Sequence, residues 1–172
     1  MTLPPAFSGK DNIHAIIETP RNSRNKYTFD KQTGLFLLKK SLPAGLSFPL
    51  DFGFIPNTKA EDGDPLDVLI FMEEPGFPGC VVDCKVIGVL EAQQKKEGKL
   101  IRNDRVLAIA SESRLFARVE RPSDIGDKFL KELINFFELY HEKEGNHFKV
   151  LEVAEANKAY KLIKENLHYE GN

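Results

Sequence analysis

Several things that the sequence lacks narrow its class before any motif is considered. The 172 residues contain no tryptophan and only two cysteines. No apolar run approaches the roughly 18 residues of a membrane-spanning helix. The chain also lacks an excess of basic residues, because 24 Lys and Arg stand against 26 Asp and Glu. We therefore expect a protein that binds neither nucleic acid nor a membrane.

The scarcity of cysteine also bears on the compartment. Cys80 and Cys84 lie in one strand-like run, where four residues span about 13 Å, too far for a disulfide. No further Cys or His partners stand at metal-site spacing, so we expect two reduced structural thiols. The N-terminal segment MTLPPAFSGKDN has no basic region followed by an apolar stretch, unlike a signal peptide. The expected location is the cytoplasm.

The first two thirds of the chain read as short strands separated by turns and prolines. Thr33 and Gly34 indicate the turn of a hairpin, Gly88 predicts a bulge within a strand, and the polar residues 93–98 are expected to form a turn. The expected strands cover residues 15–19, 26–30, 35–38, 67–71, 81–90 and 106–110.

The last third changes to the spacing of helices. Apolar residues recur with helical period over 127–141, and Gly145 supplies a stop. A final helix is expected over 156–167. Strands followed by helices in a chain of this length predict one domain, residues 1–172, of the α+β class and mainly β, built as a small β-barrel with packed helices.

The strongest chemical signal is the acidic loop Glu61-Asp62-Gly63-Asp64-Pro65-Leu66-Asp67. Carboxylates packed this tightly repel one another unless they are solvated at a turn or held by a divalent cation, and oxygen ligands suit Mg²⁺ or Mn²⁺. A solvated acidic turn is the alternative. An EF-hand is rejected, because Asp67 stands where that loop requires glycine.

The same loop, extended through Val68-Leu69, resembles the signature of the soluble family I inorganic pyrophosphatases. The resemblance runs in order from about residue 17 to residue 150. It includes Ile17-Glu18-Thr19-Pro20, Asn25-Lys26-Tyr27, Phe52 to Thr58, Gly88-Val89-Leu90 and Phe136-Phe137-Glu138-Leu139-Tyr140. It implies a five-stranded OB-like closed barrel with flanking helices and a C-terminal helix. It also implies Mg²⁺-dependent hydrolysis of pyrophosphate to two phosphates, and a homo-oligomer, a hexamer in the compact prokaryotic form.

The resemblance further implies a role for individual residues. Asp62, Asp67 and Asp104 would be the ligands of the metals that activate water, and Glu18 would line an outer metal site. Asp64 would accept the proton of that water. Lys26 and Tyr140 would hold phosphate oxygens, and the substrate-binding positions of the family's Arg and Lys are taken by Lys40 and His141.

Several other positions depart from the family pattern. Thr28 and Gln94 stand where the family has carboxylates, and Val106 stands where it has a lysine. Phe48 and Phe52 replace two tyrosines, so hydroxyl groups are lost from the mouth of the barrel. These losses predict reduced activity.

The departures keep two alternatives open. One is a metal-dependent hydrolase of another phosphoanhydride, whose organic group would meet the apolar Phe48, Phe52 and Val106. The other is a catalytically impaired binding protein that keeps the pyrophosphatase fold.

Overall fold

The computed structural model describes residues 3–168 and consists mainly of strands. Two α-helices and a short 3-10 turn, η1 (Pro122–Ile125), accompany them in this part of the chain. The strands are β1 (Asn12–Thr19), β2 (Asn25–Asp30), β3 (Leu35–Ser41), β4 (Asp51–Phe54), β5 (Asp67–Phe71), β6 (Val81–Lys96), β7 (Lys99–Arg102), β8 (Arg105–Ala110) and β9 (Phe148–Glu155). The helices are α1 (Asp127–Lys143) and α2 (Ala156–Glu165).

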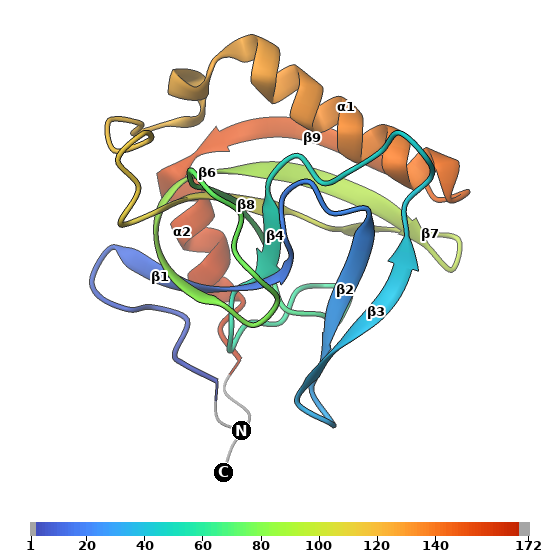
Figure 1. The fold of residues 1–172 in the computed structure, drawn as a ribbon, viewed down its shortest axis with the longest axis horizontal. Helices are drawn as coiled ribbons and strands as arrows, with labels where there is room; N and C mark the ends of the chain where they lie inside the picture. The colour runs from blue at the N-terminus through green and yellow to red at the C-terminus, as the bar shows by residue number, and fades with distance from the viewer. Residues whose placement is uncertain (1–2, 169–172) are drawn as a thin grey trace.

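Five of the strands close into the predicted barrel. Hydrogen bonds join β1, β4, β5, β8 and β6 in that order, and β6 pairs again with β1. The pair β5–β8 is parallel, whereas the other pairs of the ring are antiparallel. Figure 1 shows β6 curving around the ring. No free edge therefore remains within the ring itself.

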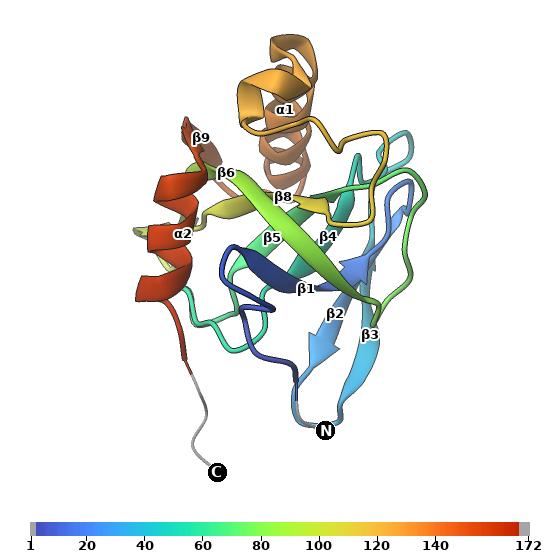
Figure 2. The same ribbon diagram turned by 90° about the vertical axis from the view of Figure 1, so that its left-hand side faces the viewer.

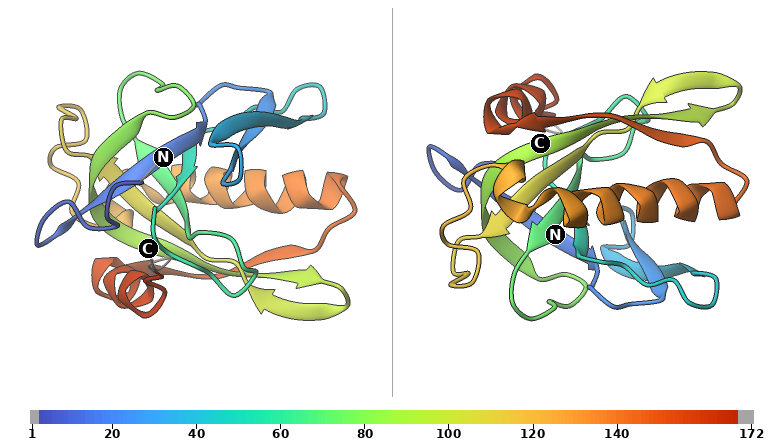
Figure 3. Two further views of the ribbon diagram at one scale, coloured as in Figure 1. Left: turned by 90° about the horizontal axis from the view of Figure 1, so that it is seen from below. Right: turned by 90° about the horizontal axis from the view of Figure 1, so that it is seen from above.

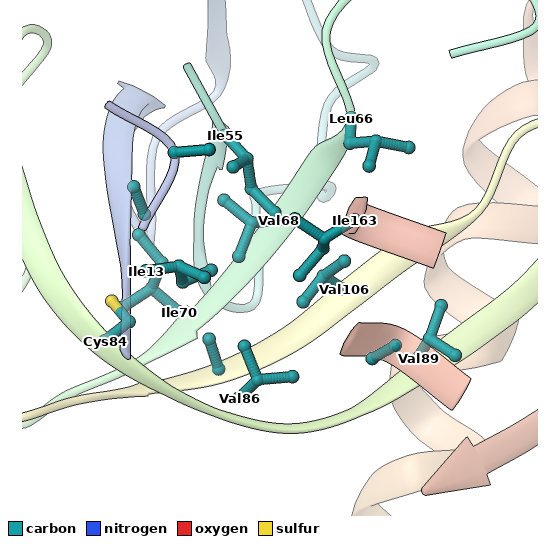
Figure 4. Packing of buried hydrophobic residues seen from close by; sticks show 14 of the residues in the cluster. Ile13, Ile55, Leu66, Val68, Ile70, Cys84, Val86, Val89, Val106 and Ile163 are labelled. Atoms are coloured by element: carbon teal, nitrogen blue, oxygen red, sulfur yellow. The ribbon is translucent and has the colours of Figure 1, made fainter. Parts of the chain in front are cut away.

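The barrel interior is filled by small and branched side chains that α2 seals at one side. Val68, Ile70 and Val106 lie in this core with Ile163 of α2, and all four side chains are fully buried. Figure 4 shows these side chains converging between the strands and α2. Val106 was expected at the apolar mouth of the site, and the structure corrects this: it faces the sealed interior, because it alternates with Arg105 and Leu107 along β8.

A second, aromatic core lies outside the ring, beneath α1. Phe137 and Tyr140 of α1 pack there with Phe48, Phe52 and Phe148. Figure 3 shows α1 lying across the barrel, between the β2–β3 hairpin and the β6–β7 hairpin. The helix begins and ends close to the predicted bounds, and Gly145, with a φ of 72°, follows it as expected.

The β2–β3 hairpin stands beside the ring as a separate two-stranded sheet, which Figure 2 shows clearly. Its turn contains Gly34 at a φ of 71°, as the sequence predicted. The bulge at Gly88 is confirmed as well, by a register shift between Val86 and Gly88. A Cβ at Gly88 would lie 2.4 Å from the carbonyl oxygen of Ala154, so β9 can approach β6 only where there is no side chain.

The strands differ from the prediction in four places. The polar residues 93–96 continue β6 instead of turning, because they pair with both β7 and β9, and the turn falls at Glu97 and Gly98. The strands β4, β7 and β9 were not predicted. β4 is only four residues long and contains Gly53, whose missing side chain lets the backbone of β1 pass closely. Among residues 3–168, no helix is long and apolar enough to cross a membrane.

Candidate functional site

The acidic loop places three carboxylates at the start of β5. Asp62 accepts a hydrogen bond from the backbone N–H of Asp64 at 3.1 Å, and Gly63 provides a φ of 92° between them. Asp67 then opens β5, where it lies opposite Arg105 of β8 in the parallel register. The hydrogen bond within the turn and the positive φ of Gly63 therefore orient the loop toward the rim of the barrel.

A small polar hollow lies where this loop faces the β2–β3 hairpin, and we call it the hairpin hollow. Its volume is about 160 Å³. Residues from β1, β2, β3, β4 and the acidic loop line it: Glu18, Lys26, Thr28, Phe29, Lys31, Lys39, Phe52, Phe54, Asp64, Pro65 and Asp67. The hollow thus sets lysines of the hairpin against carboxylates of the barrel rim.

Burial shifts the pKa values of the charged groups in the hairpin hollow. It raises the pKa of Glu18 to about 7, although the backbone N–H of Phe29 donates to that carboxylate at 2.6 Å. Burial also raises the pKa of Asp67 to about 6, against the opposing effects of Arg105 and Lys26. The pKa of Lys26 falls to about 8 for the same reason. Groups with pKa values near neutrality are frequent at catalytic sites.

Arg105 is the buried cation behind Asp67. Its Nε lies 3.5 Å from Oδ2 of Asp67, and the side chain is only 3% exposed. Its Cζ lies 4.3 Å from the ring centre of Phe137 and 4.1 Å from that of Phe148. Two of its donors, Nε and Nη1, have no hydrogen-bond partner within the described part of the chain. A buried guanidinium with unsatisfied donors is energetically costly unless an additional partner binds.

Tyr140 and Lys40 lie on the α1 side of the same region. The Nζ of Lys40 is 4.9 Å from the ring centre of Tyr140 and 2.5 Å from Oε2 of Glu144. Lys26 reaches toward the same ring, with its Nζ 5.8 Å from the ring centre. Burial raises the pKa of the Tyr140 hydroxyl, and the neighbouring Lys40 opposes this rise. The structure therefore brings together Lys26, Lys40 and Tyr140, three of the predicted substrate-binding residues.

His141 is placed differently from an exposed phosphate-binding group. Its Nδ1 lies 2.8 Å from the carbonyl oxygen of Phe137, and its ring stacks on Phe148 with centres 4.5 Å apart. Burial and the nearby Arg105 lower the pKa of His141 to about 3. The ring is therefore neutral at physiological pH, unlike the family's lysine at this position.

Asp104 lies in a different hollow from Asp67. Its carboxylate accepts a hydrogen bond from the backbone N–H of Ala92 at 2.8 Å and pairs with Arg102 Nη2 at 2.8 Å. It lines the helix cleft, which we define as the groove of about 380 Å³ between the strands and α2. This cleft is larger than the hairpin hollow, but its buried acid is already satisfied by partners. Asp104 therefore lines a different hollow from Glu18 and Asp67.

Amide side chains occupy the space beside Asp62. The Nδ2 of Asn103 donates to Oε1 of Gln94 at 2.8 Å, and Nε2 of Gln94 lies 3.5 Å from Oδ2 of Asp62. Across the described residues, no group of three or more His, Cys, Asp or Glu is arranged to enclose a metal ion. Any cation here must share one or two carboxylates with water or substrate oxygens, which is how Mg²⁺ is commonly held.

Comparison with known proteins resolves the family. The sequence profile described as inorganic pyrophosphatase matches residues 15–170. The chain belongs to the inorganic pyrophosphatase family. It is 39% identical over 153 residues to an inorganic pyrophosphatase of Halalkalibacterium halodurans, covering 89% of this chain and 91% of that one. The crystal structure of inorganic pyrophosphatase from Thermus thermophilus matches with a TM-score of 0.88 at 32% identity, covering 96% of this chain and 95% of that one.

Membership of the pyrophosphatase family gives the fold and implies a divalent cation. Sequence reasoning missed two features of this chain's site, the buried Arg105 and the hollow-lining Lys39. Arg105 is the charged first residue of the apolar run Arg105–Ala110, so the pattern alone does not distinguish a solvated strand end from a buried cation. Its pairing with Asp67 depends on the parallel register of β5 and β8, which no local pattern encodes.

Proposed function

We propose that this protein hydrolyses inorganic pyrophosphate to two phosphates in the hairpin hollow, with the help of a divalent cation. The observation that carries the proposal is the placement of Asp64 and Asp67 opposite Lys26 in one small hollow of a pyrophosphatase-family fold. Carboxylates suit the cation, and a lysine suits a phosphate oxygen. Phosphoryl transfer depends chiefly on such positioning and neutralisation of charge.

The donor set on the acidic loop fits Mg²⁺, with Mn²⁺ as a substitute. Asp62, Asp64 and Asp67 offer hard oxygen atoms from one loop, and Mg²⁺ is commonly bound by one or two carboxylates together with substrate phosphates. Glu18 lines the same hollow and supplies a further carboxylate. A bound divalent cation would neutralise phosphate charge and lower the pKa of a water molecule that it holds.

Individual side chains accept the proton of the attacking water and orient the phosphate groups. Asp64 is exposed at the rim of the hollow, so it accepts the proton of the attacking water and passes it to solvent. Lys26 and Tyr140 orient phosphate oxygens, and Lys40 reinforces them from the α1 side. His141 contributes through packing, since its neutral ring is held by Phe137 and Phe148.

The size of the hollow bears on the first alternative, a different phosphoanhydride substrate. Sites for drug-sized ligands usually span about 300–1,000 Å³. The hairpin hollow, at about 160 Å³, suits a small anion better than a nucleoside diphosphate. Pyrophosphate is therefore the favoured substrate.

A specific observation favours the second alternative, a catalytically impaired binding protein. Asp104 is paired with Arg102 and the Ala92 N–H and lines the helix cleft, and the amides of Gln94 and Asn103 lie beside Asp62. These features lower the negative charge available to a cation. We accordingly propose an activity that is reduced relative to the family.

The remaining assignments stay predictions: one domain over residues 1–172, a cytoplasmic location and a homo-oligomer, a hexamer by family resemblance. Gel filtration with light scattering of the purified chain measures the oligomeric state. A mass of one or two protomers would contradict the hexamer.

The decisive test of the activity is phosphate release from pyrophosphate, with Mg²⁺ and with EDTA, by the wild type and by Asp64→Asn. We expect Mg²⁺-dependent release by the wild type and a loss of about 100-fold or more in the variant, the lower range for losing a general base. Glu74→Gln, a surface change outside the hollow, serves as the control. Equal release in all samples would refute the proposal.

A further inference from the structure

The β2–β3 hairpin carries one wall of the hairpin hollow, and it is attached to the barrel differently from the ring strands. Within residues 3–168 it shares no strand pairing with the ring, although β2 lies beside β1. Lys26 and Lys39 of the hollow belong to this hairpin, whereas Asp64 and Asp67 belong to the acidic loop and β5. The spacing between these lysines and carboxylates therefore depends on how the hairpin is fastened to β1.

Two consecutive side chains of β1 take the place of a strand pairing. The fully buried hydroxyl of Thr19 accepts a hydrogen bond from the backbone N–H of Tyr27 at 3.0 Å and donates to the carbonyl oxygen of Tyr27 at 3.4 Å. Oε1 of Glu18 accepts from the N–H of Phe29 and from the hydroxyl of Thr28. Successive side chains of a regular strand point to opposite faces, but the register of β1 shifts at Glu18, and such a bulge lets both reach β2.

Thr19 fastens the hairpin at the residue next to Lys26. Lys26 directly precedes Tyr27, and its Nζ lies 5.1 Å from the ring centre of Phe52. Phe52 is in turn the register partner of Thr19 where β1 pairs with β4. Thr19 therefore contacts both the backbone that carries Lys26 and the strand that carries the ring beneath its ammonium group.

We propose that Thr19 is a positioning residue, which sets the spacing between the hairpin lysines and the carboxylates and thereby controls how tightly the hollow binds a diphosphate. The inference rests on the proposed function for the identity of the ligand. A hydroxyl group both donates and accepts, so it holds the backbone of Tyr27 in one position, whereas a valine of similar shape does neither. Without this joint β2 can shift against β1 and move Lys26 away from the substrate, and binding groups are sensitive to displacements of about 1 Å.

The test is calorimetric titration of methylenediphosphonate, a diphosphate that cannot be hydrolysed, into the full chain with Mg²⁺. Thr19→Val removes the hydroxyl and Thr19→Ser keeps it. We expect Thr19→Val to bind the analogue about tenfold more weakly, as for one lost hydrogen bond, and Thr19→Ser to stay within about twofold of the wild type. Ser113→Ala is the matched control, because the buried hydroxyl of Ser113 also accepts a backbone N–H, that of Phe116, but outside the hollow.

A second readout distinguishes positioning from a general loss of stability. In steady-state phosphate release, Thr19→Val should raise KM for pyrophosphate about tenfold and change kcat by less than about threefold, because the lost interaction acts on substrate binding. Hydrogen exchange should become faster at the amide of Tyr27, which loses its acceptor, but not at that of Ile70 within the ring. Faster exchange at both amides, with KM unchanged, would show a purely structural role and overturn the inference.

The outcomes separate this inference from the proposed function. Equal affinities of the wild type and Thr19→Val for the analogue would overturn the inference alone, and so would an equal loss of affinity in Thr19→Ser or Ser113→Ala. Binding of the analogue that depends on the Thr19 hydroxyl, in a protein that releases no phosphate from pyrophosphate, would support the inference and refute the proposed function.

Thr28→Val covers the case in which Thr19→Val does not fold. Thr28 is only half-buried, and its hydroxyl donates to Oε1 of Glu18 at 3.3 Å across the same joint. Because Glu18 still accepts the Phe29 N–H in this variant, we expect a smaller loss of affinity for the analogue, about threefold, and none in Thr28→Ser. Unchanged affinity in Thr28→Val would contradict the inference.

Discussion

Asp67 and Asp104 lie near the starts of adjacent strands, yet their surroundings differ. Asp104 is satisfied by the Ala92 backbone and by Arg102 at 2.8 Å. Oδ2 of Asp67 lies 3.5 Å from the Nε of Arg105, and burial raises the pKa of Asp67 to about 6. Both belong to the acidic pattern of the sequence, but only Asp67 has unused binding capacity. The comparison indicates that Asp67, whose hydrogen bonding is incomplete, takes part in catalysis, whereas Asp104, whose hydrogen bonding is complete, stabilises the fold.

The largest effect is expected from removing the charge of Asp67. Asp67→Asn should lower kcat/KM for pyrophosphate by about 100- to 1,000-fold, the range for losing one preorganised electrostatic contact. Steady-state phosphate release in Mg²⁺ measures it. Asp104→Asn is the partner variant, and a loss per folded molecule as large as that of Asp67→Asn would remove the distinction.

Removing Asp104 should instead lower the free energy of unfolding. Asp104→Ala leaves the Ala92 N–H and the Arg102 guanidinium without their acceptor, which should cost about 2–3 kcal/mol. Urea denaturation measures this change. Asp64→Ala, at an exposed loop position, is the control and should stay within about 0.5 kcal/mol of the wild type. Equal destabilisation by the two variants would contradict the structural role of Asp104.

The buried His141 should make stability depend on pH. Its pKa is depressed from 6.5 in the unfolded chain to about 3 in the fold, so the unfolded chain binds the proton first. Its stabilising contribution is complete above pH 6.5 and declines as the pH falls toward 3, by about 2 kcal/mol between pH 7 and pH 5.

Comparison with His141→Gln isolates this contribution from Glu18 and Asp67, whose raised pKa values act in the opposite direction. Urea unfolding at pH 7 and pH 5 provides the measurement. Parallel pH profiles for the wild type and His141→Gln would show that the ring is not held neutral.

The smallest expected change is a gain beside Asp62. Gln94→Glu puts a carboxylate where an amide now lies 3.5 Å from Asp62, and it should tighten Mn²⁺ binding about tenfold by adding one charged ligand. Calorimetric titration of Mn²⁺ measures the affinity. Gln93→Glu, at the neighbouring position on β6, is the matched control, and an equal gain there would reveal only general electrostatic attraction.

The sequence was most informative where the signal is local. The turn at Gly34, the bulge at Gly88, strand β5 and helix α1 follow from glycine positions and hydrophobic period. The ordered motifs also led to the family and the barrel. Strand β9 was missed because its pairing with β6 spans some sixty residues of chain, a partnership that its own pattern does not reveal.

The candidate site was harder to predict because it depends on non-local pairings. Asp67, Lys26 and Tyr140 were named from motifs, but the diversion of Asp104 depends on the position of Arg102 at the end of β7. The position of the buried Arg105 beside Asp67 depends on the parallel register with β5 and on two aromatic rings, one from α1 and one from β9. Apart from the pair of Arg102 and Asp104, these contacts join residues that are far apart in the sequence.

The most direct test of the contrast between the two aspartates is to locate the cation. Crystals grown with Mn²⁺ and a non-hydrolysable pyrophosphate analogue would give an anomalous signal at the metal. We predict a peak within about 2.3 Å of a carboxylate oxygen of Asp67, at the hairpin hollow, with Asp104 still paired to Arg102. A peak at Asp104 in the helix cleft, or none near Asp67, would contradict the account.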